Sequence, residues 1–290
     1  EVIPEIDMPG HNQALHAAYP EFFCFPKPDM NVRTTAGNSR ELVCPQKPEV
    51  WEFYAAVFKE LKDIFPSGTV HLGGDEAPTE LWGKCPLCRE ARTKTGMKDE
   101  QEQMRAFFAK TTVLLAKNGQ TPQFWYEGNA GIYHPGETVY AWRQDQALQS
   151  IEKTKKAGLN LIMASNEYCY LDFPQIQGQR NWGWMKTTTL QKCYELDPAF
   201  GKPEKEAGHI RGVHAPVWAE RLPDLDHLLY RAYPRACAIA EAGWSPMSVR
   251  SWENFRRKLA DHRQFILKRF NYDMKRTQGN EPAFRWENNK

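Results

Sequence analysis

The sequence predicts an α/β fold built on a parallel sheet, with a (β/α)8 TIM barrel as the favoured architecture. Short apolar runs alternate with stretches of helical periodicity, as expected for strands joined by crossover helices. The run 159–164 is apolar at nearly every position, which indicates burial on both faces of the sheet. No glycine-rich phosphate loop follows a run, since Gly73-Gly74 leads into Asp75-Glu76 and these carboxylates would repel a phosphate. The barrel is therefore favoured over an open nucleotide-binding sheet.

The apolar runs are the expected strands. They lie at 1–7, 69–72, 123–126, 138–142, 159–164 and 212–218. A complete barrel needs eight βα units, and only about six are visible here. We therefore expect an incomplete barrel from which two units are absent.

Helical periodicity fills most of the intervals between these runs. The expected helices lie at 50–65, 104–116, 147–157, 225–242 and 252–270. In the first of them Val50, Tyr54 and Phe58 share one stripe, and the turn 66–68 stops it. Pro234 should kink or split the helix 225–242. The tryptophans expected in the core are Trp51, Trp244 and Trp252.

Composition indicates one globular domain. No low-complexity tract or linker interrupts the 290 residues, so we expect a single domain at 1–290. Because the chain begins without Met and directly in strand-like Val2 and Ile3, we expect this domain to lack its N-terminal part. The net charge of +2 predicts no nucleic-acid partner. No apolar run approaches the roughly 20 residues of a membrane-spanning helix.

The cysteines leave two interpretations open. Cys85 and Cys88 have zinc-knuckle spacing, but no second half-site follows them, so pairing or plain burial is favoured over a metal. Cys24 and Cys44 flank a loop that a disulfide between them would close. We therefore predict no metal and no cofactor. The cysteines expected to be small buried apolar groups are Cys169, Cys193 and Cys237.

Carboxylates and aromatic rings gather at the expected strand ends, where a (β/α)8 barrel carries its chemistry. Each alone has an ordinary explanation, as a helix cap or as rim packing. Together they suit a sugar, because carboxylates accept paired hydroxyls and flat rings pack on the apolar C–H faces of a pyranose. We therefore predict a glycoside hydrolase. The groups are Asp7 and His11, Asp75 and Glu76, Trp125 and Glu127, Trp142, Tyr170 and Asp172, and Trp218 and Glu220.

The pair Asp75-Glu76 raises a geometric difficulty. Neighbouring side chains on a strand point to opposite faces, so both reach one site only if the strand has already ended. Gly73-Gly74 allows such a turn. Adjacent carboxylates would still not flank a sugar as a nucleophile and an acid. One of them should instead support another nucleophile, such as one on the substrate.

These motifs resemble glycoside hydrolase family 20, the β-N-acetylhexosaminidases. His71-Leu72-Gly73-Gly74-Asp75-Glu76 looks like the signature of that family's fourth barrel strand, and 5–11 looks like its third-strand motif. The remaining matches fall in order on the fifth to eighth strands and extend to about residue 245. They are Trp125-Tyr126-Glu127, Trp142, Tyr170-Leu171-Asp172 and Trp218-Ala219-Glu220.

The resemblance implies a retaining, substrate-assisted mechanism. The acetamido oxygen of a terminal N-acetylglucosamine or N-acetylgalactosamine would attack its own anomeric carbon and form an oxazolinium ion. Glu76 would act as acid and then as base, Asp75 would orient the acetamido group, and His11 would lie close to Glu76. The expected substrate-binding residues are Trp125, Trp142, Tyr170 and Trp218 around the N-acetyl sugar, with Asp172 and Glu220 on its hydroxyls. The implied partner is a glycan or chito-oligosaccharide, and the implied location is outside the cytoplasm.

The sequence departs from the family pattern at its N-terminal end. The family's first two strands, with an Arg and an Asp that hold the sugar, have no counterpart. A non-catalytic or partner-dependent glycan-binding fragment therefore stays an alternative, although Asp75 and Glu76 speak against it. A metal-dependent barrel hydrolase is a further alternative, and its ligands would be His11, His71, Asp75 and His214. These histidines lack the HxH or HExxH spacing of known metal sites.

The long segment 173–210 offers a second possible subsite. It contains Trp182 and Trp184, which would pack as an ordered surface loop or form a platform for a second sugar. Both interpretations stay open.

Overall fold

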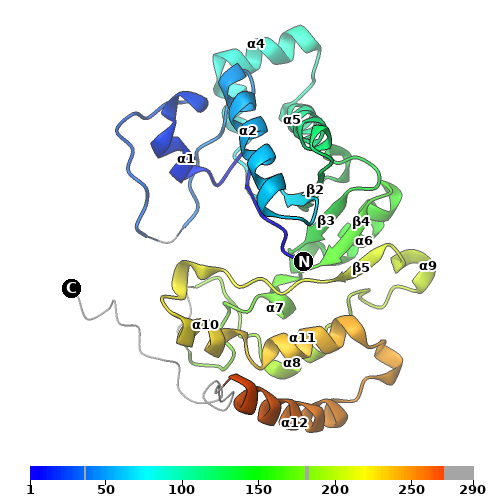
Figure 1. Cartoon of the computed structure of the whole chain (residues 1–290). Coiled ribbons are helices and arrows are strands. Elements are labelled where there is room, and N and C mark those ends of the chain that lie inside the picture. The colour runs from blue at the N-terminus through cyan, green and yellow to red at the C-terminus, as the bar shows by residue number, and fades with distance from the viewer. Residues whose placement is uncertain (36, 180–182, 271–290) are drawn as a thin grey trace. The chain divides into compact units, whose positions relative to one another are not determined.

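The computed structural model describes residues 1–35, 37–179 and 183–270, and within them it contains a five-stranded sheet (Figure 1). Its strands follow one another in sequence order. β1 pairs with β2, and β2 with β3, in parallel, with Val70 opposite Pro122 and Phe124 opposite Val139. The predicted α/β class with a parallel sheet is confirmed. The strands are β1 (Thr69–His71), β2 (Thr121–Trp125), β3 (Thr138–Ala141), β4 (Asn160–Met163) and β5 (Ile210–Val213).

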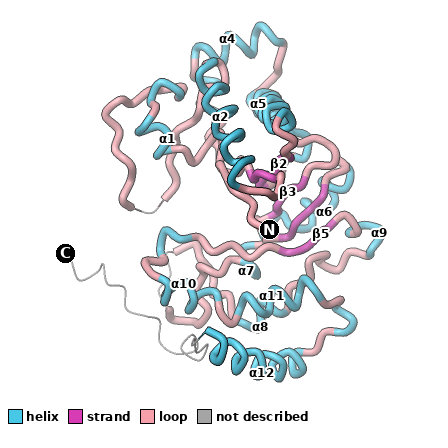
Figure 2. The backbone as a smooth tube through the Cα atoms, in the orientation of Figure 1, coloured by secondary structure: helices cyan, strands magenta, loops and turns pink. Residues whose placement is uncertain are grey.

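The chain divides into two compact units. Unit 1 comprises 1–140 with 149–161, and unit 2 comprises 141–148 with the residues from 162 onward. Loops connect short elements over much of the chain (Figure 2). None of the helices within the described residues is long and apolar enough to cross a membrane.

Unit 1 packs its helices on the first strands. Pro48, whose fixed φ suits a first helical turn, begins α2, and the Asp99 side chain caps α5 by accepting a hydrogen bond from the Glu102 N–H at 2.9 Å. Phe108 of α5 lies 4.5 Å from Phe124 of β2 between ring centroids. The helices of this unit are α1 (Gln13–Ala18), η1 (Pro20–Phe22), α2 (Pro48–Ile64), α3 (Glu80–Lys84), α4 (Pro86–Thr95), α5 (Glu100–Lys117), η2 (Ala130–Ile132) and nearly all of α6 (Ala147–Lys156).

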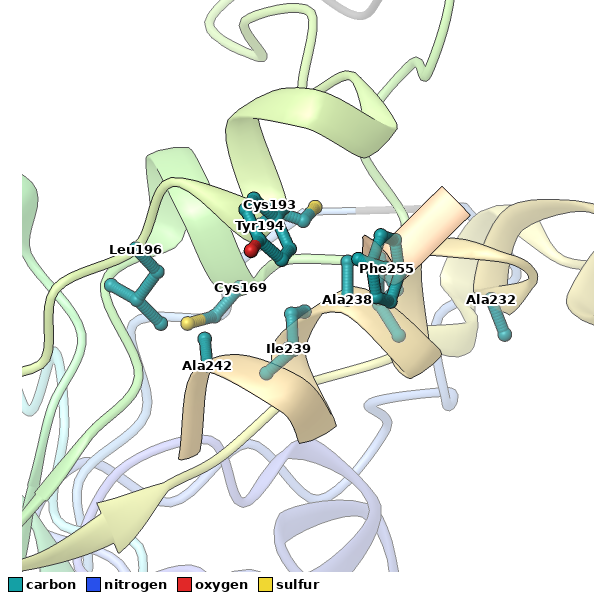
Figure 3. Packing of buried hydrophobic residues seen from close by; sticks show 10 residues of the cluster. Cys169, Cys193, Tyr194, Leu196, Ala232, Ala238, Ile239, Ala242 and Phe255 are labelled. Atoms are coloured by element: carbon teal, nitrogen blue, oxygen red, sulfur yellow. The ribbon is translucent and has the colours of Figure 1, made fainter. Parts of the chain in front are cut away.

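Unit 2 has an apolar core between α8, α11 and α12 (Figure 3). Ile239 and Ala238 of α11 are buried there together with Phe255 of α12. Cys169 and Cys193 lie in the same core, as predicted. The remaining helices are η3 (Gln144–Gln146), α7 (Asn166–Cys169), α8 (Leu190–Tyr194), α9 (Glu204–Ala207), η4 (Ala219–Arg221), α10 (Leu225–Ala232), α11 (Arg235–Trp244), η5 (Met247–Val249) and α12 (Trp252–Phe270).

The expected strand at 1–7 is wrong. Only Glu5 forms an isolated parallel bridge, to His71 of β1. The His71 N–H donates to the Pro4 carbonyl at 2.9 Å, and the Ile6 N–H donates to the His71 carbonyl at 2.9 Å. The Met8 N–H likewise donates to the Leu72 carbonyl at 3.0 Å, whereas Pro4 has no N–H to extend this ladder toward the N-terminus, so the segment follows β1 by single hydrogen bonds without becoming a strand.

Other boundaries also differ from the prediction. The last strand ends at Val213, before Pro216, so 214–218 is loop rather than strand. Pro234 separates α10 from α11, as predicted.

Trp51 is buried, but Trp244 is 89% exposed, so the prediction that Trp244 lies in the core is wrong. Cys24 and Cys44 are both free thiols in the structure, so the disulfide that the sequence left open is not formed.

Candidate active site

A glycine turn follows β1 and brings its carboxylates round to one side. Gly73 and Gly74 have φ angles of 62° and 95°, a left-handed region that other residues rarely adopt. A Cβ on Gly73 would lie 2.0 Å from Oδ1 of Asp7, and a Cβ on Gly74 would lie 2.7 Å from Cζ of Phe108. The Gly74 N–H donates to the same Asp7 oxygen at 3.0 Å. The backbone therefore passes so close to Asp7 and Phe108 that only glycine fits.

Both carboxylates of the Asp75-Glu76 pair face one imidazole. Nε2 of His11 lies 3.5 Å from Oδ2 of Asp75 and 3.5 Å from Oε2 of Glu76. Glu76 has a φ of 50° and His11 a φ of 51°, so strained backbone at both residues turns the side chains toward each other. The turn thus brings adjacent carboxylates to one side, as the sequence predicted.

Electrostatic interactions favour a protonated His11. Interactions with the Asp75 and then the Glu76 carboxylate raise the pKa of His11 to about 11. Burial, and secondarily the Asp75 carboxylate, hold the pKa of Asp7 well above its ordinary value. One imidazolium therefore neutralises part of a dense acidic cluster. One ligand atom from each of Asp7, His11 and Asp75 lies within 4.8 Å of the others, so these three residues could also hold a metal ion.

Asn38 also contacts Glu76 and was not predicted from the sequence. Its Nδ2 donates to Oε2 of Glu76, and the Arg33 guanidinium donates to the Asn38 carbonyl at 2.9 Å. Asn38 lies on the loop between η1 and α2, where a single asparagine gives no periodic or motif signal.

Trp125 lies in a buried polar and aromatic cluster of unit 1. Its indole N–H donates to Oε1 of Glu5 at 2.9 Å, and its ring centroid lies 5.1 Å from that of His71. Tyr140 of β3 lies 5.0 Å from His71 and 5.5 Å from Trp125. The Glu127 N–H donates to the Tyr133 hydroxyl at 3.3 Å, just beyond the end of β2.

Unit 2 gathers the other predicted aromatic residues. Tyr170 is buried, and its ring centroid lies 6.3 Å from that of Trp142 in a stacked arrangement. Trp218 meets Tyr170 edge-on at 6.0 Å. Three rings from separate strand ends therefore share one cluster.

Asp172 and Glu220 interact electrostatically in this unit. Asp172 is buried, and burial raises its pKa to about 7, with the Glu220 carboxylate as a further raising influence. Glu220 itself is exposed on η4. The Glu220 carboxylate therefore lies near enough to influence the pKa of Asp172.

Arg235 was not predicted from the sequence, although it holds the segment that carries Tyr170 and Asp172. It is fully buried, and its guanidinium donates to the carbonyls of Leu171 and Thr188. Burial lowers the pKa of Arg235 to about 10. An arginine within the otherwise small and apolar start of α11 is a weak signal that could have revealed it.

The predicted second subsite is described only in part. Trp184 is 57% exposed and lies 5.1 Å from Phe173 between ring centroids. Trp182 lies outside the described residues.

A parallel α/β sheet with a carboxylate pair at one strand end and grouped rings at others is typical of enzymes that act on sugars. The chain belongs to glycosyl hydrolase family 20: the sequence profile of that family's catalytic domain matches residues 1–247. The resemblance predicted from the motifs is confirmed.

Relatives of known identity agree with this assignment. A beta-hexosaminidase of Akkermansia muciniphila is 93% identical over 290 residues, which are 100% of this chain and 59% of the relative. The crystal structure of a beta-N-acetylhexosaminidase, 93% identical, superposes with a TM-score of 0.96 over 99% of this chain and 61% of that one. A Streptomyces plicatus N-acetyl-beta-hexosaminidase in complex with Thio-NAglucal is 30% identical, with a TM-score of 0.74 over 92% of this chain and 50% of that one. This chain therefore spans about three-fifths of the length of the first two proteins.

Proposed function

We propose that this chain carries the catalytic residues of a β-N-acetylhexosaminidase that removes terminal, non-reducing β-linked N-acetylglucosamine or N-acetylgalactosamine from glycans or chito-oligosaccharides. The observation that carries the proposal is the adjacent Asp75-Glu76 pair, both of whose carboxylates face His11. Carboxylates on neighbouring residues cannot stand on opposite sides of a sugar as nucleophile and acid. The nucleophile must then come from elsewhere, and the acetamido group of the substrate supplies it.

The reaction proceeds in two balanced steps. In the first, the acetamido oxygen forms a bond to the anomeric carbon while the glycosidic bond breaks, and Glu76 protonates the leaving oxygen. In the second, water adds to the anomeric carbon of the oxazolinium ion, Glu76 accepts its proton, and the acetamido group is restored. The configuration is retained because two displacements occur on opposite faces.

Asp75 and His11 have electrostatic roles in this scheme. Asp75 orients the acetamido N–H and stabilises the positive charge of the oxazolinium ion. The imidazolium of His11 stabilises the carboxylate that Glu76 becomes once its proton has left. Asp7 lies in the same cluster, and its contact with Gly74 holds the turn that carries the pair.

The aromatic residues wall the sugar. Rings of Trp142, Tyr170 and Trp218 present flat faces to the N-acetyl group and the pyranose, and the Tyr170 hydroxyl bonds the acetamido oxygen. Trp125 contributes a further ring. Asp172 and Glu220 accept hydrogen bonds from sugar hydroxyls.

The same family likeness supports a fuller account of the fold and the location. β1 to β5 would be the fourth to eighth strands of a (β/α)8 barrel within a single catalytic domain, and the segment 1–8, which hydrogen-bonds to β1 without forming a strand, would occupy the position of the third. Enzymes of this kind meet their glycans outside the cytoplasm, so we place the protein in the periplasm, a lysosome or the extracellular space. Fractionation of cells that produce it tests the location, and recovery only in the cytosol would contradict it.

Replacement of the acid tests the proposal. Glu76→Gln should lower kcat on an aryl N-acetyl-β-glucosaminide by about 100- to 10,000-fold, because proton donation contributes that much to such reactions. Glu90→Gln, on the exposed face of α4, is the matched control and should keep normal kcat. Near-normal hydrolysis by Glu76→Gln would remove Glu76 from the mechanism, and an inactive parent would favour a purely glycan-binding protein.

Trp184 is proposed as a platform for a second sugar. Its exposed ring, supported from one side by Phe173, suits stacking with a pyranose. Trp184→Ala should lower kcat/KM on an N-acetylated disaccharide by about fivefold and leave an aryl monosaccharide unaffected, since stacked rings contribute about 1 kcal/mol. Equal effects on both substrates would contradict a second subsite.

A further inference from the structure

Four cysteines of unit 1 come together in space although they are far apart in sequence. The Sγ atoms of Cys24, Cys44, Cys85 and Cys88 all lie within 4.8 Å of one another. We propose that these four thiolates bind one zinc ion in a closed, structural site. The site lies outside the proposed catalytic cluster and takes no part in the chemistry of hydrolysis.

The sulfur spacing matches tetrahedral zinc. With Zn–S bonds of about 2.3 Å, the edges of a regular tetrahedron of sulfurs are about 3.8 Å long. Sγ of Cys88 lies 3.7 Å from Sγ of Cys24 and 3.6 Å from Sγ of Cys44. A disulfide would require about 2.05 Å between its sulfurs. All four residues are free thiols in the structure.

The backbone presents the four sulfurs from two short structures. Cys85 directly precedes α4, and Cys88 lies in the first turn of that helix, so its C-x-x-C segment forms a compact knuckle. The second pair flanks an antiparallel bridge between Phe23 and Val43. On either side of that bridge, the Cys24 N–H donates to the Leu42 carbonyl at 3.1 Å, and the Cys44 N–H donates to the Phe22 carbonyl at 2.9 Å. Two residues distant in sequence, Cys24 and Cys44, thus supply the second half-site, which no motif in the sequence indicates.

Contacts independent of the sulfurs hold the two halves together. The indole N–H of Trp82, three residues before Cys85, donates to the carbonyl of Val43 at 2.9 Å. Cys44, Cys85 and Cys88 are buried, and Cys24 is partly buried. The ammonium of Lys47 donates to the Phe23 carbonyl at 3.0 Å and places a positive charge beside a site whose zinc tetrathiolate carries a net negative charge. Four buried soft ligands leave no open position, which is typical of structural rather than catalytic zinc.

The metal would close the loop that reaches the proposed acid. Cys24 and Cys44 are the two ends of this loop, and Asn38 on it donates to Glu76. Zinc would fix both ends to α4 and thereby limit the positions that Asn38 can take. This functional consequence rests on the proposed hydrolase, whereas the metal site itself does not.

Metal analysis of the purified full chain tests the site directly. After dialysis against metal-free buffer, we expect about one zinc per chain by inductively coupled plasma mass spectrometry. Cys88→Ser should reduce the zinc content by at least about tenfold, because one of four ligands is lost. Cys237→Ser, which removes a half-buried thiol outside the cluster, should retain the full content.

A spectroscopic measurement keeps the test valid if Cys88→Ser fails to fold. Cobalt(II) exchanged into the full chain should give the intense visible and charge-transfer absorption of a tetrahedral cobalt thiolate, and added zinc should abolish it. Zinc well below one per chain, iron in its place, or disulfide-linked Cys peptides in the non-reduced protein would overturn the proposal.

Activity measurements separate this proposal from the proposed function. Removal of zinc by a chelator should lower kcat on an aryl N-acetyl-β-glucosaminide about tenfold, and Asn38→Ala should do the same with zinc still bound, since each weakens one charge-assisted hydrogen bond to Glu76. Unchanged kcat after complete removal of zinc would overturn the link between the metal and Asn38. Zinc binding without hydrolysis would remove the hydrolase and leave the metal site intact.

Discussion

His11 has an environment that couples protonation to stability. Two carboxylates lie 3.5 Å from its Nε2 and raise its pKa from 6.5 to about 11. Below about pH 6.5 the imidazole is protonated in both the folded and the unfolded chain, and its stabilising contribution is complete. Above that pH only the folded chain keeps the proton, so the contribution decreases and is lost as the pH rises through 11.

The pH dependence of unfolding tests this environment. The difference in free energy of unfolding between the parent and His11→Gln should be largest at pH 6 and should shrink steadily toward pH 10, because the unfolded imidazole releases its proton first. Urea titrations at several pH values measure it. His262→Gln, which removes an exposed histidine of α12, is the control variant in the same titrations. A difference between the parent and His11→Gln that stays constant over this range would show that His11 is not held as an imidazolium.

At the scale of elements, the turn after β1 decides where the carboxylates lie. Gly74 combines a φ of 95° with a contact to Phe108, whose ring is fully buried and packs against Phe107, Phe124 and Tyr133. Such a ring has no free direction in which to move. The turn is therefore rigid for steric reasons, and its rigidity orients Asp75 and Glu76.

A pair of glycine substitutions separates crowding from backbone strain. Gly74→Ala should lower the free energy of unfolding by about 2 to 4 kcal/mol, from the left-handed φ together with the 2.7 Å contact. Gly96→Ala has a similar φ of 73° but nothing within 4 Å of its new Cβ, so it should cost about 1 kcal/mol. Denaturant titration measures both. Equal losses would show that the contact with Phe108 does not constrain the turn.

The sequence predicted those features that repeat along it or follow from single residues. Alternating runs indicated β1 to β5, Pro234 indicated the break between α10 and α11, and Gly73-Gly74 indicated the turn. The strand at 1–7 was overestimated because the prediction rested on apolar content and disregarded that Pro4 has no N–H to donate to β1. Trp244 was misplaced because it is the last residue of α11, where the buried stripe of the helix has ended.

The features that were missed depend on folding of the loop between η1 and α2. Asn38 reaches Glu76, and Cys24 and Cys44 reach Cys85 and Cys88, only because that loop returns across the start of α4. Neither contact has a fixed sequence spacing. The sequence spacing therefore indicated the Cys85-Cys88 half of the cysteine cluster but not its contact with Cys24 and Cys44.

At the scale of the whole molecule, the family assignment and the local geometry are both consistent with the proposed function. The family profile covers 1–247, which includes every predicted site residue. The geometry adds a physical reason for substrate assistance, namely that the acid and its neighbouring carboxylate share one side and one imidazolium. Under the proposed function neither carboxylate acts as a conventional nucleophile, and the acetamido group of the substrate takes that role.

A comparison of two substrates tests that central claim most directly. The full chain is assayed on an aryl N-acetyl-β-glucosaminide and on the aryl β-glucoside with the same leaving group, which differs only in lacking the acetamido nucleophile. We predict that kcat/KM is at least about a thousandfold higher for the N-acetylated substrate, because a well-oriented internal nucleophile has a very high effective concentration. Comparable kcat/KM values for the two substrates would contradict substrate-assisted catalysis at Asp75-Glu76.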